Sequence, residues 1–136
     1  MDTIGFHYIV EAAGCRPEVI GDPERMREIL LAGAKVGKME IRTSYFYRFT
    51  PTGVSGVVIV AESHITIHTW PEYRYVALDV YVCGTSSFPE EAIDYILKEL
   101  GCTYAHVSEI KRGIRDEDVY THTILTWDED LKLTQV

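Results

Sequence analysis

The chain has 136 residues, of which 46% are hydrophobic and 25% are charged, and 13 Lys and Arg against 21 Asp and Glu give it a formal net charge of −8. This length suits one domain with its own core and leaves no room for a separate cofactor-binding domain. The acidic balance argues against a nucleic-acid partner and against a polybasic membrane anchor, because both need clustered cations.

The N-terminal half contains two predicted strands and one predicted helix. Residues 4–10 alternate apolar side chains on one face, which predicts a strand. Asp22 is a suitable N-cap, Pro23 suits the first helical turn, and apolar residues at helical spacing continue to a stop at Gly37. Residues 40–49 are rich in aromatic and β-branched residues and predict a second strand, followed by a turn at Pro51–Gly53.

The C-terminal half contains one more predicted helix and several strands. The strands are expected at residues 57–60, 65–70, 75–82, 103–110 and 121–127. The first of these is apolar throughout, a pattern typical of a strand that is buried on both faces or lies deep in a sheet. Ser87–Glu90 has the spacing of a capping box, and the helix behind it should end at Gly101. Residues 111–118 are charged and are expected to form a loop.

The balance of about seven strands and two helices decides the expected fold class. Two helices are too few for a doubly wound parallel sheet, so we expect an α+β two-layer sandwich. Its sheet should be mostly antiparallel, with the two main helices on one face, and residues 1–136 should form a single domain. The other face of the sheet would then need a cover, and a second copy of the chain is the simplest one, so we expect a homodimer.

Cellular location and cysteine chemistry follow from what the sequence lacks. No segment approaches the ~18 consecutive apolar residues of a membrane span, and the first eight residues do not resemble a signal peptide. We therefore expect a cytoplasmic protein without a membrane partner. Cys15, Cys83 and Cys102 are odd in number and include no CxxC pair, which argues against a disulfide framework and against structural zinc.

One segment concentrates reactive side chains between predicted strands. It reads AESHITIHTWPE at residues 61–72 and is followed by DVYVCG at residues 79–84. The GxGxxG, GxxxxGK[ST], HExxH and GxSxG motifs are absent from the chain. His64 and His68 fall on the same face of a strand, but four residues of strand span roughly 13 Å. That separation is too large for one ion, and we expect no metal site.

This pattern resembles the small pyruvoyl-dependent S-adenosylmethionine decarboxylases of bacteria and archaea. The resemblance extends from GFHY near the N-terminus through SEIKRG to THTILTW. It implies a proenzyme that cleaves itself between Glu62 and Ser63, giving residues 1–62 (the β chain) and 63–136 (the α chain). Ser63 would become a pyruvoyl group, the only cofactor. The substrate S-adenosylmethionine would form a Schiff base with it and release CO2, in the biosynthesis of spermidine and other polyamines.

Elementary chemistry is compatible with self-cleavage at Ser63. A serine hydroxyl can attack the preceding carbonyl and convert the amide to an ester, and a strained turn favours this attack. Taken alone, Ser63 would be an ordinary turn serine. The resemblance gives His68 a role in proton removal during processing and Ser55 a supporting role at the reacting oxygen. A continuous strand would put Ser63 and His68 on opposite faces, so either a turn breaks the alternation or the role of His68 is wrong.

The resemblance also implies residues that act on the substrate. Cys83 would donate the proton that replaces CO2, and a thiol pKa of about 8.5 suits that task. Glu72 would bind the ribose hydroxyls and Phe49 would stack on the adenine. A core aromatic is an almost equally good interpretation of Phe49, and a solvated turn acid remains open for Glu72. Cys15 and Cys102 are interpreted as buried apolar side chains.

Two other functions remain open at this point. The first is a relative that decarboxylates arginine with the same pyruvoyl group, because the processing and proton-transfer residues would be identical. The second, from another class, is a non-catalytic dimeric binding domain that never cleaves. An assay that offers both substrates separates the first alternative, and an intact chain after prolonged incubation would indicate the second.

Overall fold

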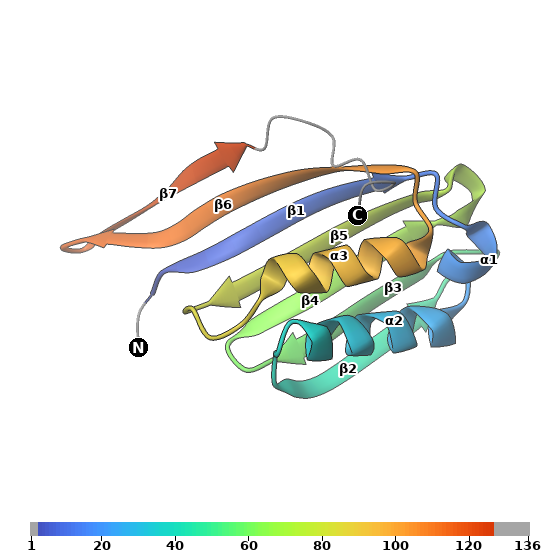
Figure 1. Ribbon diagram of the computed structural model, residues 1–136, viewed down its shortest axis with the longest axis horizontal. Coiled ribbons are helices and arrows are strands. Elements are labelled where there is room, and N and C mark those ends of the chain that lie inside the picture. The colour runs from blue at the N-terminus through green and yellow to red at the C-terminus, as the bar shows by residue number, and fades with distance from the viewer. Residues whose placement is uncertain (1–2, 127–136) are drawn as a thin grey trace.

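A computed structural model describes residues 3–126, and the side chains of residues 3–124. One layer is an antiparallel sheet of seven strands in the order β2-β3-β4-β5-β1-β6-β7. The elements are β1 (Gly5–Ala13), α1 (Pro17–Ile20), α2 (Pro23–Val36), β2 (Ile41–Arg48), β3 (Val54–Val60), β4 (Ser63–Trp70), the 3-10 turn η1 (Pro71–Tyr73), β5 (Tyr75–Cys83), α3 (Pro89–Leu100), β6 (Tyr104–Asp116) and β7 (Val119–Thr126). The long helices α2 and α3 lie side by side on one face of the sheet (Figure 1). The expected two-layer α+β sandwich is confirmed.

The core lies between the two helices and the covered face of the sheet. Its fully buried side chains alternate along the central strands and recur at helical spacing along α2 and α3, and include Val58, Ile65, Ile67, Leu78, Val80, Ile29, Leu30, Ile96, Leu97 and Leu100. Gly33 of α2 allows the two helices to approach closely, because a Cβ at this position would lie 2.6 Å from Ile96 of α3. The helices therefore form a tight pair above the sheet.

Local signals placed most of the helix ends correctly. Asp22 caps α2 by accepting a hydrogen bond of 3.0 Å from the backbone N–H of Glu24, and Gly37 ends this helix. Gly101 ends α3 with a φ of 68°, a conformation that glycine adopts at little cost. The capping box predicted to begin at Ser87 is wrong. Pro89 occupies the first turn, so Phe88 is the N-cap, and its side chain makes no capping hydrogen bond.

The strand predicted at residues 57–60 is confirmed as part of β3, inside the sheet between β2 and β4, but its burial on both faces and the loop predicted at residues 111–118 are wrong for related reasons. Ile59 of β3 is 45% exposed, so the run at residues 57–60 is not buried on both faces. Within residues 3–126 no helix lies on that face of the sheet. The predicted loop at residues 111–118 mostly belongs to β6, which runs to Asp116 and pairs with β7. This hairpin projects beyond the helices (Figure 1). A strand there faces solvent on both sides and can carry polar residues on both faces, so its charged residues resembled a loop in the sequence.

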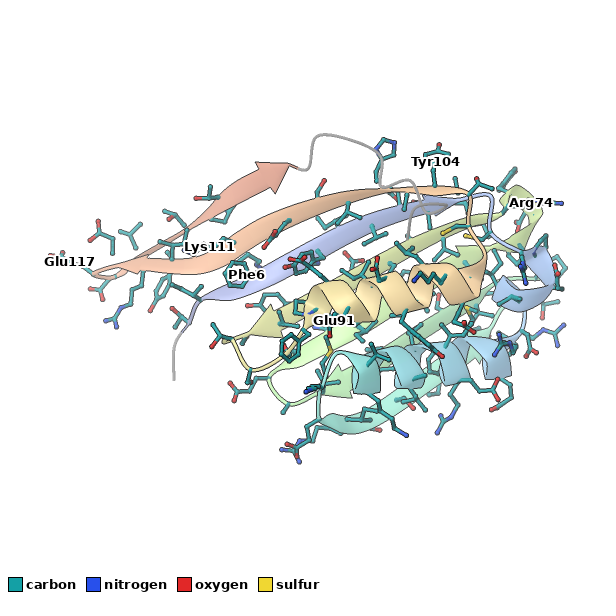
Figure 2. The ribbon with its side chains drawn as sticks, in the orientation of Figure 1. Phe6, Arg74, Glu91, Tyr104, Lys111 and Glu117 are labelled. Atoms are coloured by element: carbon teal, nitrogen blue, oxygen red, sulfur yellow. The ribbon has the colours of Figure 1, made fainter. Side chains whose placement is uncertain are left out.

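The extent of the hairpin is visible in the side-chain view. Figure 2 shows Glu117 at its tip, with Lys111 further back along β6 and Tyr104 at the opposite end of the same strand. Trp127, the last residue of the predicted final strand, lies outside the described residues. No helix among the described residues is long and apolar enough to cross a membrane.

Candidate functional site

The bond between Glu62 and Ser63 lies at the end of a tight hairpin. Val60 of β3 pairs with Ser63, the first residue of β4, so Ala61 and Glu62 alone form the loop. Glu62 has a φ of 63°, in the left-handed region that favours glycine at the second position of such turns. A glutamate held in this conformation carries roughly 1–3 kcal/mol of backbone strain. The expectation of a tight, strained turn next to Ser63 is confirmed.

Ser63 is hydrogen-bonded to the residue that the resemblance names as the catalytic thiol. The backbone N–H of Cys83, at the end of β5, donates to the Ser63 hydroxyl oxygen over 3.1 Å. Both residues line a cavity of about 220 Å³, together with side chains from the loop after α2 and the loop before α3. The structure therefore places Ser63 and Cys83 in the lining of one pocket, joined by the hydrogen bond from the Cys83 backbone to the Ser63 hydroxyl.

Tyr81 is a neighbour of Cys83 that the sequence reasoning missed. Its phenol is hydrogen-bonded to Cys83, and burial followed by this hydrogen bond raises the pKa of Tyr81 above its usual value. The guanidinium of Arg112 lies over the Tyr81 ring, 4.8 Å from its centroid. Strand alternation could have indicated this contact, because residues two apart on a strand share a face.

A second pair of predicted residues meets on the open face of the sheet. The Ser55 hydroxyl of β3 and Nδ1 of His68 on β4 share a hydrogen bond of 2.7 Å, because these two residues are direct partners across the strands. They line a shallow cavity of about 210 Å³ whose walls include the rings of Tyr45 and Tyr47. This pair is accessible from the side of the sheet that lacks helices.

The two pairs do not meet within one protomer. β4 is continuous from Ser63 to Trp70, so no break in the alternation turns His68 towards Ser63. The two residues lie on opposite faces, and five strand residues separate their Cα atoms by about 16 Å. In a single chain His68 is therefore too distant to take a proton from Ser63.

Phe49 and Glu72 lie at the end of the sheet away from Ser63. Phe49 directly follows β2, is 47% exposed, and packs edge-to-face on Tyr47 with ring centroids 4.9 Å apart. Glu72 lies in η1, directly after β4, and is also exposed. The topology thus groups both residues with the end of β4 that carries His68, and separates them from Cys83.

A further polar cluster occupies the open face between these two regions. Nε2 of His7 on β1 donates to Asp79 on β5 over 3.0 Å, and the ring of His64 packs against both His7 and Tyr81. Burial, followed by the neighbouring His7, lowers the pKa of His64. No group of three or more His, Cys, Asp or Glu side chains within residues 3–126 could hold a metal ion.

Comparisons with known proteins show which proteins this chain resembles in sequence and in fold. A family model described as S-adenosylmethionine decarboxylase matches residues 6–113. The chain is 67% identical over 132 residues to an S-adenosylmethionine decarboxylase proenzyme of Pyrococcus furiosus, covering 96% of this chain and 95% of that protein. A proenzyme of the same name from Carboxydothermus hydrogenoformans is 44% identical over 118 residues, covering 87% of this chain and 93% of the relative. The crystal structure of the adenosylmethionine decarboxylase from Aquifex aeolicus superposes with a TM-score of 0.79 at 35% identity, over 88% of this chain and 98% of that one.

Proposed function

The chain belongs to the S-adenosylmethionine decarboxylase family, and from this membership we propose that it is a proenzyme that becomes an S-adenosylmethionine decarboxylase by cleaving itself before Ser63. Its product would serve as the aminopropyl donor for polyamine biosynthesis in the cytoplasm. One observation carries the proposal: the Ser63 hydroxyl lies directly after a strained peptide unit, accepts a hydrogen bond from the Cys83 N–H, and shares a pocket with that residue.

The surroundings of Ser63 are suited to a pyruvoyl group formed from this residue. Ser63 begins a strand, so after cleavage the group would be the N-terminus of residues 63–136, at the mouth of a cavity rather than in the core. The N–H of Cys83 already donates to the Ser63 oxygen, and can stabilise the oxygen during processing. In the mature enzyme the pyruvoyl group would supply a carbonyl that accepts the electron pair released as CO2 leaves.

Self-cleavage uses atoms that the chain supplies, apart from one water. The Ser63 oxygen attacks the Glu62 carbonyl carbon, the peptide C–N bond breaks, and an ester replaces the amide. Removal of the Ser63 α-proton then expels the Glu62 carboxylate by β-elimination. Water hydrolyses the remaining enamine to the ketone, and ammonia is released. The positive φ of Glu62 favours the first step, because breaking the peptide bond releases the strain of the turn.

Cys83 and Tyr81 would handle the proton that replaces CO2. Cys83 lines the Ser63 pocket, and its thiol would donate this proton. Tyr81 is a positioning residue, since its phenol contacts the thiol and is itself held beneath the Arg112 guanidinium. Protonation of the substrate carbon by Cys83 completes the exchange of CO2 for a proton.

We further propose that the active unit is a homodimer with sites shared between subunits. The cavities at Ser63 and at His68 measure about 220 and 210 Å³, and each is smaller than the ~300–1,000 Å³ typical of a ligand site. The open face of the sheet carries the exposed apolar side chains Tyr45, Tyr47, Ile59 and Trp70. A two-fold axis that stacks two open faces with their strands reversed would bring Ser55 and His68 of the partner subunit towards the Ser63 end.

The same packing would complete the binding site for the substrate. Glu72 and Phe49 belong to the His68 end of the sheet, so they would approach Ser63 from the other subunit. A glutamate carboxylate can accept two hydrogen bonds from ribose hydroxyls, and the exposed Phe49 ring can stack on adenine or contact the sulfonium cation. The carboxylate of Glu72 and the aromatic pair Phe49–Tyr47 favour a cationic nucleoside as the substrate.

Intact mass under reducing, denaturing conditions tests self-processing, and product analysis tests the substrate. We expect two fragments, residues 1–62 and 63–136, the second without a free N-terminal amine. Ser63→Ala should leave one uncleaved chain, and Ser44→Ala is a matched control that should cleave normally. The mature protein is then given S-adenosylmethionine or arginine and CO2 is measured. Release from arginine alone would contradict the substrate, and a persistently intact wild-type chain would contradict the whole proposal.

A further inference from the structure

Two of the three cysteines lie together in the interior, far from Cys83. Cys15 follows the end of β1 and is 0% exposed, and Cys102 lies between α3 and β6 and is 9% exposed. Their thiols are hydrogen-bonded to each other. The sulfur of Cys102 also lies 3.4 Å from the backbone oxygen of Leu97 in the last turns of α3. Both cysteines are free thiols in this structure.

The backbone holds the two cysteine-bearing segments side by side. On one side of the pair, the N–H of Thr103 donates to the oxygen of Ala13 over 2.9 Å. On the other side, the N–H of Arg16 donates to the oxygen of Leu100 over 3.0 Å. Figure 1 shows the end of β1 and the connection from α3 to β6 next to each other at the end of the sheet that carries α1. Such bracketing hydrogen bonds hold segments at roughly the 4.4–6.8 Å Cα separation that a disulfide requires.

Two glycines confirm how closely these segments approach. A Cβ on Gly14 would lie 2.2 Å from the hydroxyl oxygen of Thr103, and a Cβ on Gly101 would lie 2.7 Å from Nε of Arg16. Each glycine, the immediate neighbour of a cysteine, thus packs directly on the opposite segment. Both have positive φ, so a larger side chain would be excluded by conformation as well as by space.

We propose that Cys15 and Cys102 are a disulfide-forming pair that covalently joins the two chains of the mature enzyme. The interchain character rests on the proposed cleavage before Ser63, since Cys15 belongs to residues 1–62 and Cys102 to residues 63–136. The bond itself does not depend on cleavage, because the pair already meets in the uncleaved chain. Cys83 is the third thiol, lies at the opposite end of the sheet, and stays reduced for its role in proton transfer.

A small-molecule disulfide is the oxidant for this reaction. The Cys102 thiolate attacks one sulfur of that disulfide, which releases one thiolate and leaves a mixed disulfide on Cys102. Cys15 then loses its proton and attacks the Cys102 sulfur, which releases the second thiolate. Both released thiolates take up the protons lost by the two cysteines, so two thiols are oxidised and one disulfide is reduced. Cys102 reacts first because it is the more exposed and because the hydrogen bond from Cys15 lowers its pKa.

The experiment compares the mature protein with and without reductant. The protein is incubated with oxidised glutathione, its remaining thiols are blocked with iodoacetamide, and it is denatured for intact mass analysis. Without reductant we expect one species, equal to both chains less two hydrogens, with a single alkylated thiol at Cys83. With reductant this species should separate into two chains. Separation without reductant, with three alkylated thiols or only glutathione adducts, would overturn the proposal.

Matched variants identify the sulfurs and separate this proposal from that of self-cleavage. Cys15→Ala and Cys102→Ala should each abolish the crosslink, whereas Cys83→Ala should keep it. If either buried variant fails to fold, peptide mapping of the oxidised wild type decides, by the presence or absence of a linked peptide pair containing both cysteines. If the chain never cleaves, it stays one species under both conditions, and the same peptide pair still reports on the disulfide.

Discussion

A mixed dimer of two inactive variants tests whether the proposed active site is shared between subunits. Ser63 and His68 lie on opposite faces of β4, about 16 Å apart along the strand. This distance is several times the reach of a proton transfer between hydrogen-bonded groups. If His68 acts on Ser63 at all, it must therefore act on Ser63 of the partner subunit. Ser63→Ala and His68→Ala should then complement each other when both chains are expressed together.

The extent of complementation follows from the symmetry of the dimer. In a heterodimer, the wild-type Ser63 of one subunit meets the wild-type His68 of the other at one site, and the second site lacks both residues. Random assembly puts about half of the His68→Ala chains into heterodimers, so about half of these chains should become cleaved. Neither variant alone supplies a complete site, so the His68→Ala chain alone should remain largely intact over the same period.

The assay uses an affinity tag on the His68→Ala chain and intact mass to measure its cleaved fraction. The matched control combines Ser63→Ala with Cys83→Ala. These two residues share one pocket in one protomer, so each site of that heterodimer lacks one of them and decarboxylation should not be restored. A cleaved fraction that stays at the level of His68→Ala alone would refute the shared site. Decarboxylation restored in the control pair would refute the placement of Ser63 and Cys83 in one protomer.

Four further outcomes follow from the described contacts. Cys83→Ala should cleave at the wild-type rate and lose decarboxylation by ~10²–10⁴-fold, measured as CO2 release, and full turnover would exclude Cys83 as the proton donor. Tyr81→Phe should cleave normally but shift the pH profile of kcat, whereas a purely structural role would lower Tm and leave that profile unchanged. Asp22→Ala should lose about 1 kcal/mol in urea denaturation because α2 loses its cap, and Asp22→Asn should lose much less. Because the pKa of His64 is lowered on folding, the unfolded chain binds more protons than the folded chain below pH ~6.5. The free energy of unfolding should therefore fall as the pH drops through that value, and should fall less in His64→Gln. Equal pH slopes for the wild type and this variant would contradict the assignment.

Rules based on neighbouring residues predicted most of the helices and strands. They were wrong where burial or exposure depends on distant parts of the fold. Asp22 was recognised as a cap because capping depends on the residues of a single turn. Ile59 was misjudged because its exposure depends on which face of the sheet the helices cover, which a short apolar run does not indicate. The charged residues 111–118 were assigned to a loop because a hairpin solvated on both faces lacks the alternation that marks a half-buried strand.

The candidate site was predictable in its parts and less so in its arrangement. Ser63 and Cys83 could be named from the motif, but the hydrogen bond from the Cys83 N–H to the Ser63 hydroxyl arises from the pairing of β4 with β5. The separation of Ser63 from His68 depended on where the turn ends. Only the structure places it at Ala61 and Glu62, which leaves β4 unbroken. The position of the turn at Ala61 and Glu62 thus decides whether His68 can reach Ser63 within one chain.

The sheet topology explains how one domain could be cut before Ser63 without falling apart. Cleavage would leave β1, β2 and β3 on one chain and β4 to β7 on the other. In the sheet, however, β1 lies between β5 and β6, and β3 pairs with β4, so strands of the two chains alternate rather than form separate blocks. Helix α2 of the first chain also packs on α3 of the second. Breaking the bond after Glu62 therefore removes one strained turn and leaves the hydrogen-bonded ladders and the core in place. Because the strands of the two chains are interleaved, the fold does not depend on the peptide bond between Glu62 and Ser63. This bond can therefore be cleaved while the sheet and the core stay intact.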